Sequence, residues 1–134
     1  MLLSMLDTNL CIRALRDRPA YIRARLQQEA ETLCISTIIL YELYVGAEQS
    51  ARPDHQRQVV EEFAAKLHLL EFDENASRHA ANIRADLSKR GMVIGSNDLL
   101  IAGHARSLGL KLITGNLSEF KRVDGLRCED WLAE

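Results

Sequence analysis

The sequence predicts an α/β domain with a mainly parallel sheet of four to five strands, covered by helices on both faces. Short apolar runs alternate with segments of helical periodicity along the chain, which is typical of strand–helix–strand units. The first run, Leu2–Leu6, is almost continuously apolar and only Ser4 interrupts it, as expected for a strand buried on both faces. No repeat, linker or low-complexity segment divides the 134 residues, so we expect one domain over residues 1–134.

The first half of the chain predicts two strands and the helices that follow them. After Leu2–Leu6, a short helical pattern covers Asn9–Leu15, and Pro19 then opens a second helix because proline suits a first helical turn. The apolar run Thr32–Ser36 predicts the second strand. The next helix should cover about 36–50, since a hydroxyl at either of its first two positions can accept a hydrogen bond from a free N–H group.

The second half predicts three further helices. Pro53 opens the first, and Glu74–Arg90 forms the second, with Gly91 as a plausible C-terminal stop. The third covers Asp98–Leu108 and follows the capping segment 95–97. The strands of this half are expected at His68–Phe72, Leu110–Thr114 and, as a short edge strand, Leu126–Cys128.

Composition and charge indicate a protein with its own hydrophobic core, no membrane-spanning segment and a locally basic N-terminal part. Apolar residues make up 47% of the chain, which is enough for a core, and no apolar run reaches about 18 residues. Without a basic leader either, we expect a cytoplasmic protein with no membrane contact. The net charge of -2 gives no general attraction to nucleic acid, yet residues 8–28 hold five arginines against one acid, Asp17. The three cysteines form no C-x-x-C pair and are expected to be reduced packing residues.

Three carboxylates are expected where a side chain should face the interior. Asp7 closes the first strand, Glu42 shares a helix face with apolar neighbours, and Asp98 lies in a first helical turn. Burying a carboxylate costs several kcal/mol unless it is paired, protonated or bound to a metal. In open α/β sheets the ligand lies beyond the carboxyl ends of the strands, where Asp7 and Asn116 are both expected. Together these oxygen-bearing residues predict a site for Mg²⁺ or Mn²⁺.

Each of these residues also has a simpler explanation. Asp7 alone could cap the following helix, and Asp98 alone could be an ordinary first-turn acid. Asn116 alone is a turn residue. Glu42 cannot act as a helix cap because it lies in mid-helix. The main alternative to a metal site is therefore a buried salt bridge between Glu42 and an arginine. The four histidines show no ligand spacing.

Several motifs, in this order and spacing, resemble the PIN-domain family and, more narrowly, its VapC ribonuclease toxins. The resemblance extends over nearly the whole chain. Its motifs are Met5–Asn9, Ile35–Ser36 leading to Tyr41–Leu43 and Gly46–Glu48, Gly95–Asp98 with Leu100–Ala102, Ile113–Thr114 with Asn116 and Glu119–Phe120, and the ending Val123–Trp131.

The resemblance implies a three-layer α/β/α PIN-like fold and a toxin of a type II toxin-antitoxin module. It implies Mg²⁺- or Mn²⁺-dependent endoribonuclease activity, a homodimer, and inhibition by a cognate VapB antitoxin in a hetero-oligomer. The family's metal positions map onto Asp7, Glu42 and Asp98. A fourth, frequently acidic, maps onto Asn116, which is neutral here and is expected to orient water or substrate. Ser96 replaces a proline that often stands before the equivalent of Asn97, which should change the loop but not the chemistry.

The expected mechanism follows from charge, because bound Mg²⁺ lets an acidic site accept an anionic phosphodiester. Asp7 and Asp98 are expected to bind the metal, and Glu42 to bind it or to act as a base through water. The residues expected to support these ligands by hydrogen bonds are Thr8, Asn9 and Thr114. Arg13 and Arg16, one helical turn apart, could hold flanking phosphates, although each taken singly is as well explained as surface charge.

The RNA itself is not specified by the sequence. Similarity to the enteric-type toxins makes tRNA the first expectation, with initiator tRNA as its leading candidate and ribosomal RNA or mRNA behind it; the products would carry 5′-phosphate and 3′-hydroxyl ends. Two alternatives stay open. One is a PIN-like RNA-binding or scaffold domain without catalysis, against which the retained acids argue. The other is a receiver-type phosphoacceptor domain, which needs an acid pair and a distal lysine that are not evident.

Overall fold

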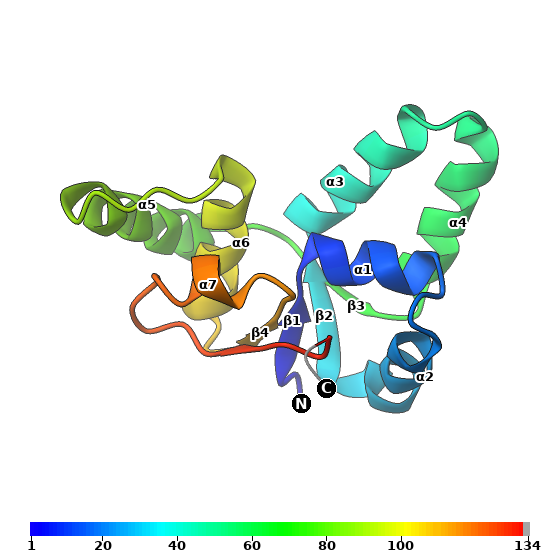
Figure 1. Ribbon diagram of the computed structural model, residues 1–134, viewed down its shortest axis with the longest axis horizontal. Helices are drawn as coiled ribbons and strands as arrows, with labels where there is room; N and C mark the ends of the chain where they lie inside the picture. The colour runs from blue at the N-terminus through cyan, green and yellow to red at the C-terminus, as the bar shows by residue number, and fades with distance from the viewer. Residues whose placement is uncertain (133–134) are drawn as a thin grey trace.

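A five-stranded sheet in the order β3-β2-β1-β4-β5 forms the centre of the protein, in a computed structural model that describes residues 1–132 (Figure 1). All neighbouring strands are parallel. The central strand β1 is buried along its whole length, as its apolar sequence requires, whereas the edge strand β3 is mostly exposed. The strands are β1 (Ser4–Leu6), β2 (Leu33–Ser36), β3 (His68–Leu70), β4 (Lys111–Ile113) and β5 (Cys128–Glu129).

Helices lie on both faces of the sheet, which gives three layers, α/β/α (Figure 1). α3 packs on α4 and α5 packs on α6, and Figure 1 shows the two pairs diverging on opposite sides of the sheet. A 3-10 turn at Ala30–Thr32 leads into β2. The helices are α1 (Thr8–Leu15), α2 (Ala20–Glu29), α3 (Thr37–Glu48), α4 (Pro53–Ala65), α5 (Glu74–Lys89), α6 (Ser96–Ser107) and α7 (Leu117–Phe120).

The predicted alternation of strands and helices is confirmed, and the differences are shifted ends of elements and one additional short helix. The fifth strand is Cys128–Glu129 rather than Leu126–Cys128, because pairing with β4 and not its own apolar run sets so short an edge strand. α6 begins at Ser96, two residues earlier than expected, so Asp98 lies within its first turn. The four-residue helix α7 is not predicted, since a segment of that length shows no periodicity.

Three helices begin at side-chain caps. The side chains of Asp7, Ser36 and Asp73 each accept a hydrogen bond from a first-turn backbone N–H group, of α1, α3 and α5 respectively. Gly91, with a φ of 66°, follows the last turn of α5 in the left-handed conformation that suits glycine. The cap of α1 directly follows β1, so the chain turns from strand to helix at the carboxyl edge of the sheet.

The strand order places a ligand crevice beside the central strand. From β1 the chain continues to β2 and β3 on one side, and only later adds β4 and β5 on the other. A ligand site in an open α/β sheet lies at this reversal, beyond the carboxyl ends of the strands. Asp7 follows β1 and Thr114 follows β4, so both residues lie at that position.

The core consists of the sheet and the inner faces of its helices, and contains few polar side chains. Cys11 and Cys34 are buried free thiols, as expected, and Cys128 is half-buried. The imidazole of His104, 1% exposed, lies with Nδ1 2.8 Å from the hydroxyl of Ser36, and burial lowers the pKa of that histidine. Across residues 1–132, no helix combines the length and the apolar character that a membrane crossing requires.

Candidate active site

Asp7 is held in place by hydrogen bonds to both of its carboxylate oxygens. It is only 5% exposed; Oδ1 accepts a hydrogen bond from the Leu10 N–H group at 2.9 Å, and Oδ2 accepts one from the Thr114 hydroxyl at 2.5 Å. Burial raises the pKa of Asp7, and the negative charges of Glu42 and Asp130 also raise it, while the two hydrogen bonds act in the opposite direction. Asp7 therefore caps α1 and faces other acids at once.

Glu42 projects from the edge of the buried face of α3 rather than from its centre. The buried residues of this helix are Ile39, Leu43 and Ala47. Glu42 is half-buried, and its Oε1 accepts a hydrogen bond from the Thr8 hydroxyl at 2.6 Å. Within residues 1–132, Glu42 is therefore hydrogen-bonded to a threonine, and the salt bridge to an arginine that was its alternative explanation is not found.

Asp98 lies half-buried in the first turn of α6 and is the most strongly perturbed acid of the site. Burial, followed by the charge of Glu119 and a hydrogen bond with it, raises the pKa of Asp98 from 3.8 to about 7, and Glu42 and Asp7 contribute further. Every one of these influences raises the pKa, so among residues 1–132 no cationic side chain offsets the negative charge at Asp98. A Cβ atom at Gly95 would lie 3.1 Å from the Asp98 Oδ2 atom, so the helix start is closely fitted around this carboxyl group.

Glu119 is a site residue that sequence reasoning missed. Its Oε1 accepts a hydrogen bond from the Gly95 N–H group at 3.0 Å, its Oε2 accepts one from the side-chain amide of Asn116, and it is hydrogen-bonded with Asp98. Glu119 lies on α7, the short helix that the sequence does not predict. The available signal was its spacing, three residues after Asn116, which places an acid back over the start of the turn.

Thr114 and Asn116 connect the end of β4 to these acids. The Thr114 hydroxyl donates to Asp7 and accepts from the Asn116 N–H group at 2.9 Å, which orients the hydroxyl proton toward the carboxylate. Asn116 is exposed and its amide is committed to Glu119. Asn9 is also exposed; its Nδ2 would lie 3.6 Å from a Cβ atom at Gly115, so it lies beside the same rim. Thr8 and Thr114 therefore support Glu42 and Asp7 by hydrogen bonds.

Arg13 is exposed near the end of α1, and Arg16 is exposed at the C-cap that directly follows this helix. Neither forms an ion pair with another of the residues 1–132. They are free to contact an anion, but the structure does not bring them into the acidic cluster.

The oxygen donors of the site fit a hydrated divalent cation. Among residues 1–132, no three or more His, Cys, Asp or Glu side chains are grouped as a metal would need them. Asp98 pairs with Glu119 instead, and Glu42 with Thr8. Mg²⁺ commonly keeps several waters and binds through only one or two carboxylates, so a finished protein cage is not required. Uncompensated negative charge around Asp7 and Asp98 is what a hard cation would neutralise.

Comparison with known proteins gives close matches over the full length. The PIN domain family matches residues 4–126. The tRNA(fMet)-specific endonuclease VapC of Salmonella typhimurium is 46% identical over 131 residues, covering 98% of this chain and 99% of the relative. Ribonuclease VapC2 of Haemophilus influenzae is 46% identical over 132 residues, covering 98% and 100%.

Solved structures agree with this similarity. The DNA-bound VapBC complex from Salmonella typhimurium contains a chain that matches with a TM-score of 0.94 at 46% identity, covering 98% of this chain and 99% of that one. VapBC2 from Rickettsia felis, bound to a promoter DNA fragment, matches with a TM-score of 0.91 at 32% identity, covering 97% and 99%.

The matched span includes every acid gathered at the carboxyl edge of β1 and β4 except Asp130. A match to the PIN domain leaves no support for the receiver-type alternative. The α/β/α order of layers and the full-length similarity point the same way. The chain therefore belongs to the PIN-domain family and, within it, to the VapC ribonucleases.

Proposed function

We propose that this protein is the ribonuclease toxin of a type II toxin-antitoxin module and cuts RNA phosphodiester bonds at the cluster formed by Asp7, Glu42, Asp98 and Glu119. The observation that carries the proposal is the gathering of these acids at the carboxyl edge of the sheet, where burial and its acidic neighbours raise the pKa of Asp98 to about 7 and no cationic side chain of residues 1–132 lowers it. Such a site repels an anionic phosphodiester unless a cation is added. The names of relatives that are 46% identical, a tRNA endonuclease and a ribonuclease, support the same activity.

A divalent cation, Mg²⁺ or Mn²⁺, would supply positive charge next to the phosphate and a bound water of lowered pKa. Asp7, Asp98 and Glu42 are the residues that would hold it. Asp7 is fixed by its two hydrogen bonds and cannot rotate away. Asp98 shares a hydrogen bond with Glu119 that requires a proton, so this proton must leave before Asp98 can bind the cation as a carboxylate. Cation affinity should therefore rise with pH through neutrality.

The substrate class follows from the relatives. VapC of Salmonella typhimurium and of Shigella flexneri are both named as tRNA(fMet)-specific endonucleases, at 46% and 45% identity. We propose tRNA as the substrate, with initiator tRNA first. The exposed Arg13 of α1 and Arg16 at its C-cap would contact phosphates outside the acidic cluster.

Substitution of Asp7 by asparagine tests the activity. Purified native protein is expected to cut initiator tRNA in the presence of Mg²⁺ and to be inactive with EDTA. Asp7→Asn should lower kcat/KM by about a thousandfold, because charge stabilisation by a bound metal is worth several kcal/mol. Asp54→Asn, which alters an exposed ion-paired acid on α4, is the matched control and should leave cleavage unchanged. Cleavage by Asp7→Asn at the native rate, or unchanged cleavage in EDTA, would refute this site.

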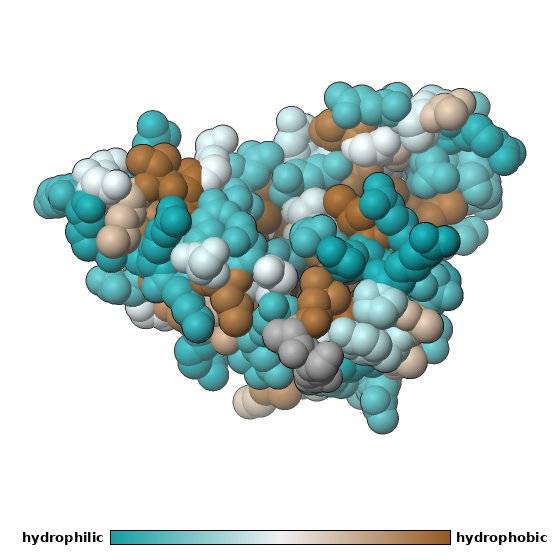
Figure 2. All heavy atoms as spheres, viewed as in Figure 1, coloured by the Kyte–Doolittle hydropathy of each residue, from teal (hydrophilic) through white to brown (hydrophobic). Residues whose placement is uncertain are grey.

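We propose a second site, an apolar groove that binds the antitoxin and that none of the acids of the cluster lines. A cavity of about 400 Å³ lies between α1, α2 and α4. Its lining includes the apolar Leu15, Leu26 and Phe63 and the charged Arg23, Glu62 and Lys66. Figure 2 shows apolar surface in this area, between α1 and α4. We propose that an apolar segment of a VapB antitoxin packs here, giving a hetero-oligomer in which the toxin itself is a homodimer.

Phe63→Asp is expected to weaken antitoxin binding at least tenfold, because it places a carboxylate in the apolar wall. Titration of the purified toxin with its cognate antitoxin measures this. Gln58→Asp adds the same charge on the exposed side of the same helix and should bind normally. Equal affinities in the two variants would place the antitoxin elsewhere. Because Phe63 lines the groove and is not part of the acidic cluster, RNA cleavage by Phe63→Asp should persist and resist inhibition.

A further inference from the structure

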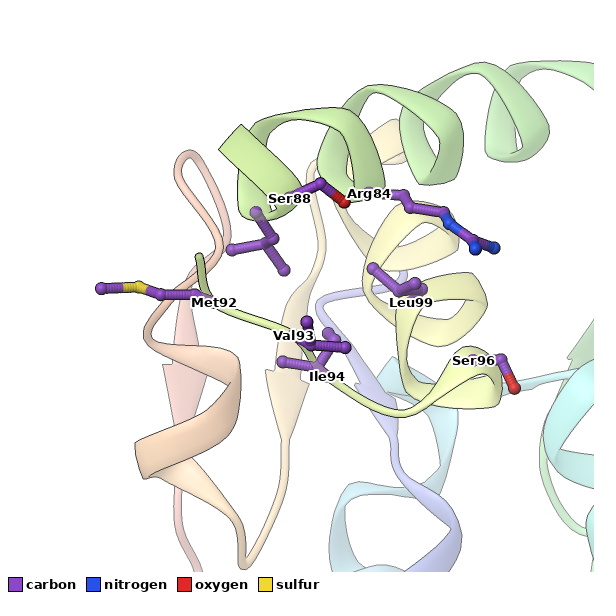
Figure 3. Close-up of a pocket in the computed structure, with 8 residues that line it drawn as sticks. Arg84, Ser88, Met92, Val93, Ile94, Ser96 and Leu99 are labelled. Carbon is purple, nitrogen blue, oxygen red and sulfur yellow. The ribbon is translucent and has the colours of Figure 1, made fainter. Parts of the chain in front are cut away.

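A cavity of about 340 Å³ opens between α5, the start of α6 and the segment 92–94 that joins them (Figure 3). Its floor is apolar, since Leu87, Ile94 and Leu99 are each at most 8% exposed. Val93, 76% exposed, lies at its mouth, and Figure 2 shows apolar surface over this connection. The volume lies within the range of about 300–1,000 Å³ that is common for small-ligand sites.

The polar side chains that line this cavity have no ion pair or hydrogen bond within residues 1–132, and none of them is acidic. Arg84 is exposed and forms no ion pair or hydrogen bond with another of the residues 1–132. The hydroxyls of Ser88 and Ser96 likewise have no hydrogen-bond partner in that part of the chain. In Figure 3, the guanidinium of Arg84 and the hydroxyl of Ser96 end on the same side, while Met92 extends outward on the other. The lining thus offers one cation and two hydroxyls above an apolar floor.

The cavity shares a wall with the proposed catalytic site. Ser96 lines it two residues before Asp98, and the N–H group of Gly95 is bonded to Glu119 at 3.0 Å. The same connecting segment is fixed from outside, because the Val93 carbonyl accepts a hydrogen bond from Arg122 at 3.0 Å. The cavity is therefore formed before any ligand arrives, and it adjoins the site where the phosphodiester would be cut.

We infer that this cavity binds the base of a nucleotide that flanks the cut bond of the RNA substrate; the inference rests on the proposed ribonuclease function. Single-stranded RNA is recognised through splayed-out bases that stack on side chains, including arginine guanidinium planes, and that form hydrogen bonds along their edges. The apolar floor accepts a base face, Arg84 can stack on it or pair with its phosphate, and Ser88 and Ser96 can bond its edge. An acid-free lining beside an acidic centre suits this polyanion.

A scan with abasic nucleotides tests this subsite. The substrate is initiator tRNA, in which one nucleotide at a time near the cut carries no base. Native protein should lose about 5- to 100-fold in kcat/KM at one abasic position, as base stacking is worth that much. Arg84→Gln and Val93→Asp should cut intact RNA more slowly, mainly through a higher KM, and should no longer respond to that abasic position. Arg78→Gln, on the same helix but paired with Glu74, should behave as native.

The outcomes separate this inference from the function on which it rests. Loss of the abasic effect in Arg84→Gln and Val93→Asp, but not in Arg78→Gln, supports the base subsite. A native protein that cuts RNA with an abasic profile unchanged by Arg84→Gln and Val93→Asp overturns the subsite and leaves the ribonuclease function intact. If Val93→Asp instead changes only the mass of the oligomer or the affinity for antitoxin, the cavity is a protein contact and the subsite is wrong. Absence of RNA cleavage by the native protein would remove both proposals.

Discussion

Replacing Asp98 by asparagine is expected to raise the melting temperature of the metal-free protein at pH 8 while abolishing RNA cleavage. Burial and the adjacent Glu119 raise the pKa of Asp98 to about 7, so at pH 8 the native protein holds a charge that the fold disfavours. Asparagine has nearly the same shape, carries no charge and can donate a hydrogen bond to Glu119. Stability and activity should therefore change in opposite directions, which is typical of a functional site under electrostatic strain.

The sign of the pH dependence follows from the same shift. The folded protein binds the Asp98 proton more tightly than the unfolded chain, whose carboxyl has a pKa near 3.8. The stability contributed by this group is therefore fully present below about pH 4 and is lost as the pH rises through about 7. Native protein and Asp98→Asn should melt at different temperatures at pH 8 and converge as the pH falls toward 4.

Thermal denaturation with and without Mg²⁺ measures both effects without relying on activity. Mg²⁺ should raise the melting temperature of native protein at pH 8 but much less at pH 5, because a ligand that binds only the folded state stabilises it and protons compete for the same oxygens. Asp98→Asn should lose most of this response. Asp54→Asn, an exposed acid, serves as the control and should respond to Mg²⁺ as native protein does. A lower melting temperature for Asp98→Asn at pH 8 would contradict the strain argument.

The positions of site residues are predicted best where the neighbouring sequence alone determines them. Asp7 is predictable because a buried strand ends directly before it and a helix starts directly after it, so both its location and its capping role are fixed locally. Asp98 is predictable for a similar reason, since glycine precedes the helix and an apolar face follows. The strand order at the carboxyl edge then brings the two acids together.

The parts that could not be predicted depend on long-range contacts. Glu119 joins the site through the backbone of Gly95, a residue 24 positions away, and lies on a helix of four residues. Glu42 was expected on the buried stripe of α3, but it lies at the edge of that stripe, where Thr8 reaches it. A periodic pattern shows which face of a helix is apolar. It does not show how far the neighbouring elements cover that face, and so it does not give the burial of a residue at its edge.

Gly103→Ala is expected to destabilise the fold by about 1–3 kcal/mol or more, through overpacking between α5 and α6. A Cβ atom at Gly103 would lie 2.6 Å from the backbone nitrogen and 2.7 Å from both the Cα and Cβ atoms of Ala80. Two of these three atoms belong to the backbone, so no side-chain rotation relieves the clash and the helices must separate. Since α6 carries Asp98 in its first turn, kcat/KM should fall together with the free energy of unfolding.

Gly46→Ala is the matched control for Gly103→Ala, because both replace a helical glycine by the same residue. No atom lies within 4 Å of a Cβ at Gly46, which is exposed on α3. That substitution should stabilise the protein by about 0.5–1 kcal/mol, since alanine loses less backbone freedom on folding. Ala80→Gly in the Gly103→Ala background should restore only part of the loss, as it removes one of the three close contacts and leaves both backbone ones. Urea denaturation of the four proteins measures these differences, and full recovery in the double variant would show that the α5 backbone can yield.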